Sequence, residues 1–187
     1  MGQYYIGVLG DSDGEFKNIR PYDQPRCYGC AKLMEHSWWN NGYVNWFAEK
    51  LYLEIPQRLA WVGDYSNLAS KSCPAPVYDA AWSSDNIPEI EAESDFTLDG
   101  KYFVNFSKKQ YLDLSAYFKR VRANTDPDDW VPNPIPLLTC FGNGEGGGDY
   151  FGSASADAIG SWAWDVVSIE DERPHEDWQE IKPTFYE

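Results

Sequence analysis

Short apolar runs separated by glycine- and proline-containing loops make up most of the sequence. The 187 residues include 15 glycines and 12 prolines, and four of the prolines lie between positions 127 and 136. Such frequent glycine and proline residues favour short strands joined by turns over long helices. A chain of this length fits one domain. The sequence therefore predicts a single compact α+β domain, residues 1–187, with a mainly antiparallel sheet and one or two packed helices.

Most of the expected strands are rich in β-branched and aromatic residues and are bounded by turn residues. Two hairpins are expected, one joining residues 4–9 to 16–19 and one joining 101–106 to 110–114. Three further strands are expected at 58–62, 135–141 and 161–169. Residues 127–136 hold too many prolines for regular structure.

The best helix candidate spans Tyr43 to Glu54. Its apolar residues recur at spacings of three and four, Asn40 or Asn41 can cap its start, and Pro56 ends it. A second, shorter helix is expected at 115–122. The acidic C-terminal segment, residues 170–187, carries Trp178, Ile181 and Phe185, with which we expect it to dock on the domain.

The charge excludes several classes of function. Fifteen Lys and Arg against 30 Asp and Glu give a net charge of −15, so a nucleic-acid backbone or an anionic membrane would repel the chain. Aromatic residues make up 17% of the chain, which argues for a folded core. No apolar stretch is long enough to span a bilayer, and neither a signal peptide nor a myristoylation motif is present. The expected location is the cytoplasm, which for a phage-encoded protein is that of the host.

The charge is also unevenly distributed. No Lys or Arg occurs from 72 to 100 or from 123 to 172, whereas residues 101–122 contain six basic residues and a single acidic one, Asp113. One interpretation is that the acidic residues simply solvate loops. The other is a negative face that binds a positively charged partner. The binding residues we predict for that face are Asp85, Glu89, Glu91, Glu93, Asp95, Asp128, Asp129 and Trp130.

The four cysteines include one close pair, Cys27 and Cys30. A zinc site would need a second pair, and Cys73 and Cys140 stand alone. A redox pair would open a helix after a strand, but residues 21–26 have a loop composition. We therefore expect reduced, structural thiols, with Cys140 in the core. No resident cofactor or metal is predicted.

Four strings combine glycine, aromatic and acidic residues: 33–38, 61–65, 143–150 and 160–165. An enzyme built on them would use carboxylates as acid and base, with aromatic rings around the substrate. Its candidate catalytic residues are Glu35, His36, Asp64, Asp149 and Asp165, surrounded by Tyr65, Tyr150 and Trp162. These carboxylates could also bind a divalent cation, magnesium or calcium in preference to zinc. The simpler alternatives are a core histidine and carboxylates that shape their own turns.

These strings, together with Met1-Gly2-Gln3-Tyr4-Tyr5, resemble a family of small bacterial and phage proteins. The resemblance extends over nearly the whole chain, and it implies a shared fold without an activity. Where the family has a glycine-bearing loop before Lys32, this chain has Cys27-Tyr28-Gly29-Cys30. That departure argues against the cysteine pair as the family's working site.

The sequence thus supports two hypotheses. The first is an acidic binding protein, of the inhibitor, immunity or anti-defence kind, that blocks a basic protein such as a nuclease or another nucleic-acid-binding protein. The second is a small hydrolase or ligand-binding enzyme with a carboxylate-lined pocket. We favour the first, because no catalytic motif is recognisable.

Overall fold

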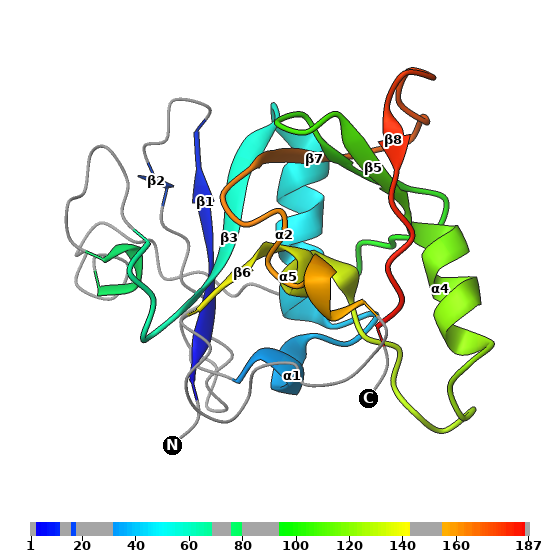
Figure 1. Ribbon diagram of the computed structural model, residues 1–187, viewed down its shortest axis with the longest axis horizontal. Helices are drawn as coiled ribbons and strands as arrows, with labels where there is room; N and C mark the ends of the chain where they lie inside the picture. The colour runs from blue at the N-terminus through cyan, green and yellow to red at the C-terminus, as the bar shows by residue number, and fades with distance from the viewer. Residues whose placement is uncertain are drawn as a thin grey trace.

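One sheet with helices packed around it forms the fold (Figure 1). The computed structural model describes residues 3–11, 16–17, 32–68, 76–79, 94–142 and 155–185. The strands are β1 (Tyr5–Gly10), β2 (Phe16–Lys17), β3 (Gln57–Gly63), β4 (Tyr102–Asn105), β5 (Gln110–Asp113), β6 (Cys140–Phe141), β7 (Val166–Glu170) and β8 (Gln179–Glu180). The helices are α1 (Leu33–His36), α2 (Gly42–Leu53), α4 (Leu114–Arg122), α5 (Pro134–Thr139) and the 3₁₀ helix η2 (Ala156–Ala158).

The strands run in the order β2-β1-β3-β7-β4-β5-β8, and β6 pairs with β3 beside this path. Neighbours are antiparallel except for two short parallel pairs, β3 with β6 and β5 with β8. The prediction of a mainly antiparallel α+β fold is therefore confirmed. β3 and β4 are not direct neighbours, because β7 from the end of the chain lies between them.

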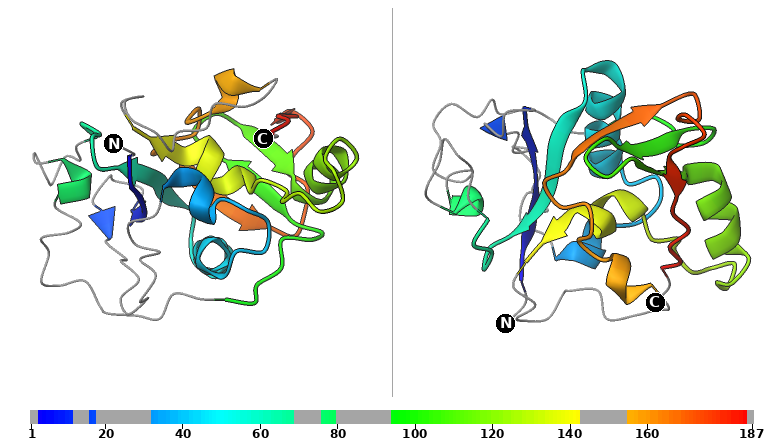
Figure 2. Two further views of the ribbon diagram at one scale, coloured as in Figure 1. Left: turned by 90° about the horizontal axis from the view of Figure 1, so that it is seen from below. Right: turned by 45° about the horizontal axis from the view of Figure 1, so that its top comes forward.

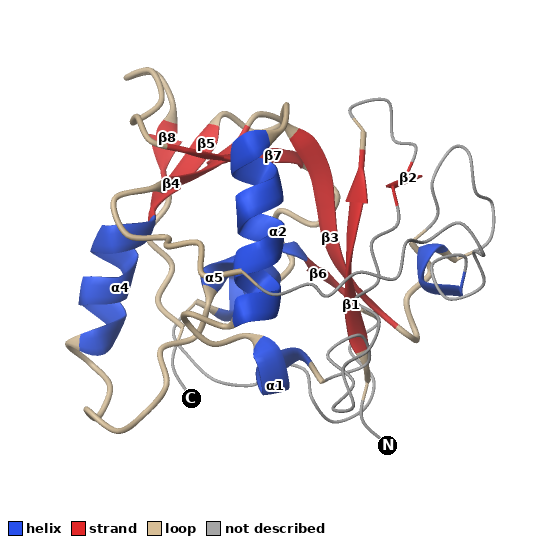
Figure 3. Ribbon diagram, turned by 180° about the vertical axis from the view of Figure 1, so that it is seen from behind, coloured by secondary structure: helices blue, strands red, loops and turns tan. Residues whose placement is uncertain are grey.

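Both predicted hairpins and both predicted helices are present. β1 pairs with β2, and β4 with β5, in antiparallel register. Asn41 caps α2 by accepting a hydrogen bond from the Val44 amide, and Asp113 caps α4 through the Ala116 amide. Figure 3 shows α2 lying across the sheet, and it contacts β7 and α5.

Two strand predictions were wrong in their extent. Residues 134–139 form α5, and only Cys140 and Phe141 of the predicted strand 135–141 pair with β3. The predicted strand 161–169 begins with a turn, in which Gly160 and Trp164 have φ values of 67° and 61°. The extended part, β7, starts at Val166. The left-handed backbone at these two positions interrupts a strand that composition alone favours.

The central strands are buried on both faces. On β3, Leu59 and Trp61 face the main core, while Ala60 and Val62 face a smaller cluster that includes Val77. Figure 2 shows the helices distributed around the sheet in two further views. The core is aromatic as composition suggests: Trp61, Trp162, Tyr43, Phe47 and Phe103 are among its largest fully buried side chains.

The C-terminal segment runs back along the domain after β8. Phe185 is buried and lies 6.2 Å from Tyr117 of α4 between ring centroids, and Trp178 packs edge-on against Phe106. Arg120 of α4 donates to the carbonyl of Pro183. Among the described residues, no helix is long and apolar enough to cross a membrane.

Candidate functional site

His36 is a core residue at the end of α1. It is fully buried, and its Nε2 accepts a hydrogen bond from the Trp61 indole at 2.5 Å. The rings of Trp61 and Tyr43 lie within 6 Å of its own, at centroid distances of 5.9 and 5.7 Å. Burial lowers the pKa of His36 to about 3, and an interaction with the Lys32 backbone opposes this only in part. His36 is therefore neutral in the fold and has no access to a substrate.

The described carboxylates of the predicted catalytic set are each engaged locally. Glu35 is exposed and accepts from the Lys32 amide in a capping arrangement. Asp64 accepts from the Tyr4 amide at 3.1 Å, and Asp165 pairs with Lys108 at 2.8 Å. Asp149 lies outside the described residues, as do Cys27, Cys30 and Cys73.

These residues lie on separate parts of the fold. Asp165 lies beside the first half of β3, where its carbonyl accepts from the Leu59 amide. Asp64 follows the last residue of that strand, and at about 3.3 Å per residue it is about 17 Å further along. Glu35 and His36 are adjacent on one helical turn, and one is exposed while the other is buried. The structure therefore does not bring the described members of this set together, and no group of three His, Cys, Asp or Glu in the described ranges could hold a metal ion.

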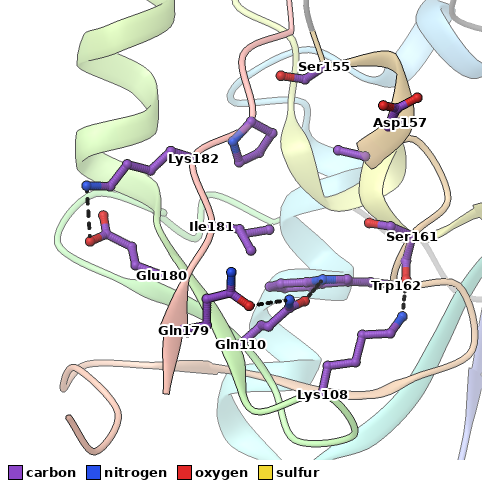
Figure 4. Close-up of a pocket in the computed structure, with 12 residues that line it drawn as sticks. Lys108, Gln110, Ser155, Asp157, Ser161, Trp162, Gln179, Glu180, Ile181 and Lys182 are labelled. Atoms are coloured by element: carbon purple, nitrogen blue, oxygen red, sulfur yellow. Dashed lines mark hydrogen bonds and ion pairs between the residues drawn. The ribbon is translucent and has the colours of Figure 1, made fainter. Parts of the chain in front are cut away.

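A pocket of the described chain lies elsewhere, between the β5–β8 edge and the segment around η2 (Figure 4). Its volume is about 610 Å³. The Trp162 indole donates to the Gln110 amide at 3.0 Å, and that amide donates to Gln179 at 3.1 Å. Lys108 donates to the Ser161 carbonyl. These contacts connect β5, β8 and the turn before β7.

None of the four described catalytic candidates, Glu35, His36, Asp64 and Asp165, lines this pocket. Trp162 was predicted as an aromatic neighbour of the site, but it is only 1% exposed and cannot serve as a platform for a ligand. Sequence reasoning missed the pocket, because its residues come from β5, β8, η2 and turns that are distant in the sequence and share no motif.

The predicted acidic binding face is described only in part. Asp85, Glu89, Glu91 and Glu93 lie outside the described residues. Asp95 is exposed. Residues 126–130, which we call the acidic loop, also expose Asp126, Asp128, Asp129 and Trp130. Both places adjoin the start of α2, since the Ser94 amide donates to Gly42 and the Trp39 amide donates to Val131.

A single arginine organises the acidic loop. One Nη1 atom of Arg122 donates to the carbonyls of Asp126, Pro127 and Asp129, at 3.0, 3.3 and 2.8 Å. Its guanidinium also lies 5.9 Å from the Phe118 ring. The cation therefore contacts the main chain of the loop, and the side chains of its three aspartates make no ion pair within the described ranges.

The chain after the acidic loop is attached to the segment between α1 and α2. Trp39 donates to Val131 at 2.7 Å, Asn133 donates to Ser37 at 2.9 Å, and Trp38 forms a bridge with Pro132. Trp130 itself is 68% exposed and packs against Trp38, with ring centroids 5.3 Å apart. A small crevice lies here, lined by Met34, Ser37, Trp38, Trp130 and Pro132.

Comparison of the chain with protein-family models, with curated proteins and with solved structures found no match.

Proposed function

We propose that the protein is an acidic binding protein, of the inhibitor, immunity or anti-defence kind, that blocks a basic protein partner through its acidic loop. The observation that carries the proposal is the role of Arg122. It holds the loop by its carbonyls and leaves the carboxylates of Asp126, Asp128 and Asp129 exposed to solvent. A preorganised loop loses little conformational freedom when it binds.

No cation among the described residues forms an ion pair with these carboxylates. Arg122 is engaged with main-chain carbonyls, and Arg120 reaches in another direction, to the carbonyl of Pro183. The chain as a whole carries a charge of −15, which adds a long-range field of the same sign. Such a field speeds the encounter with a basic protein and orients it.

The charge also supports a protein partner over direct binding to nucleic acid. Phosphates would be repelled by the same carboxylates, whereas a nuclease or another nucleic-acid-binding protein presents a basic surface that complements them. The exposed indole of Trp130 at the end of the loop would supply apolar contact area, since Trp is a frequent anchor of interfaces.

The proposal can be tested by quantitative capture from a bacterial lysate at about 50 mM and about 300 mM salt. We expect the wild-type protein to retain a basic protein, with more retained at the lower salt concentration. The double variant Asp128→Asn/Asp129→Asn should retain severalfold less. The matched control is Glu172→Gln/Glu176→Gln, which removes two exposed charges from the C-terminal segment. Equal retention by all three proteins, or no basic protein at either salt concentration, would refute the proposal.

A further inference from the structure

Trp130 is a large apolar side chain that the fold keeps in solvent. Its ring packs against Trp38 and is 68% exposed, more than any other tryptophan among the described residues. The chain on both sides is restrained, by Arg122 before it and by the Trp39–Val131 hydrogen bond after it. The main chain on either side of Trp130 is therefore held in place, and the exposed surface of its ring is available to a partner.

Two acidic residues adjoin this ring in the sequence: Asp128 and Asp129 directly precede Trp130, and both are exposed. An exposed indole face with carboxylates next to it attracts a cation in two ways, through the ring quadrupole and through the ionic charge. A neutral or anionic group would gain neither interaction.

The fold already contains cations that lie over aromatic rings, and one of them is also paired with a carboxylate. The Lys101 ammonium lies 4.6 Å from the Tyr52 ring centroid and 2.6 Å from a carboxylate oxygen of Asp171. The hydrogen bond to Asp171 raises the pKa of Lys101, and the same contact lowers the pKa of Asp171. Arg173 lies over Tyr111 at 5.3 Å. Each cation contacts the face of a ring.

We propose that the partner inserts an arginine side chain here, with its guanidinium stacked on Trp130 and hydrogen-bonded to Asp128 or Asp129. This inference rests on the proposed function, and it specifies the anchor of the interface. Arginine fits better than lysine, because its planar and weakly hydrated guanidinium can stack on an indole and still donate to a carboxylate in its own plane.

The test is a titration of the full chain, labelled with ¹⁵N, with two six-residue peptides that alternate glycine with either arginine or lysine. The indole N–H signal of Trp130 is assigned from its loss in Trp130→Phe. We expect the arginine peptide to shift this signal and to bind about fivefold more tightly than the lysine peptide. Trp130→Ala should remove that preference but keep weak, salt-dependent binding of both peptides.

Two further variants separate the contribution of the carboxylates from that of the ring. Asp128→Asn/Asp129→Asn should weaken the binding of both peptides to the same extent. Tyr65→Ala is the matched control, because Tyr65 is also an exposed aromatic residue after an aspartate, but Asp64 is engaged with the Tyr4 amide. It should change neither affinity. The amide spectrum of each variant verifies that the fold is intact.

The arginine anchor is overturned if the lysine peptide binds as tightly, if Trp130→Ala keeps the preference, or if neither peptide shifts the Trp130 signal. The proposed function is tested separately, by the lysate capture, and is refuted if no basic protein is retained there. A chain that captures a basic protein through the acidic loop but shows no arginine preference retains the function and loses only the anchor.

Discussion

At the scale of single residues, His36 couples the stability of the fold to pH. Its folded pKa of about 3 lies below the ordinary value of 6.5. Between these values the unfolded chain binds a proton that the folded chain does not, so stability rises with pH across this window and falls on acidification. The full shift corresponds to about 4 to 5 kcal/mol.

We therefore expect the free energy of unfolding, measured with urea from pH 7 to pH 4, to fall more steeply in the wild-type protein than in His36→Gln. Glutamine keeps an acceptor for the Trp61 indole but cannot be protonated. The control is His175→Gln: His175 is exposed and pairs with Asp177 at the surface, where an ion pair contributes little, so the profile of this variant should lie closer to the wild type than that of His36→Gln. Parallel profiles for the wild type and His36→Gln would contradict the assignment.

Gly7 provides a second prediction at this scale. A Cβ atom at this position would lie 2.5 Å from the Phe47 ring, which is itself enclosed by Tyr43 and Trp61. Gly7→Ala should therefore destabilise the fold by about 1 to 3 kcal/mol, through overpacking. Urea unfolding measures this loss. Phe47→Leu in the same chain should recover part of it, so the cost of the double variant should be less than the sum of the single ones.

At the scale of elements, the sequence predicted the helices and strands whose apolar pattern and capping residues lie close together in the chain. α2 follows from apolar spacing, a capping asparagine and a terminating proline, all within the sixteen residues from Asn41 to Pro56. α5 was missed because Pro134 and Pro136 suggest irregular structure, yet proline is compatible with the first turn of a helix, where its missing N–H has no partner to lose. Residues 140–141 of β6 were part of the predicted strand, but its short length and its partner could not be predicted, since they depend on pairing with β3 from a distant part of the chain.

Asn133 is the cap that makes α5 possible. It is fully buried, and its Oδ1 accepts from the Ile135 amide at 3.0 Å. We expect Asn133→Ala to lower the free energy of unfolding by about 1 to 2 kcal/mol. Asn133→Ser should stay closer to the wild type. A serine hydroxyl can also accept the hydrogen bond, so the main-chain N–H of Ile135 keeps a partner. Equal stability of the two variants in urea titrations would show that the cap contributes little.

At the scale of the whole molecule, the sequence predicted the chemistry of the candidate surface but not its architecture. The string Asp128-Asp129-Trp130 identified an acidic loop ending in an aromatic residue. Arg122 could not be assigned its role, because its acceptors are main-chain carbonyls, which every residue carries. The described members of the predicted catalytic set lie apart for a related reason, since Asp165 is placed beside β3 by the insertion of β7 between β3 and β4, whereas Asp64 directly follows the end of β3.

The net charge of −15 predicts how the whole fold responds to salt. Mutual repulsion among carboxylates disfavours the compact state, and added ions screen it. At pH 7.5, where His36 is neutral in both states, raising potassium chloride from about 10 mM to about 200 mM should increase the free energy of unfolding by about 1 kcal/mol. Chloride is preferred to sulfate, because sulfate also strengthens hydrophobic burial. Salt should have the opposite effect on partner binding, since it screens the attraction between the acidic loop and a basic surface. A fold that loses stability with salt would show that favourable charge pairs outweigh the repulsion.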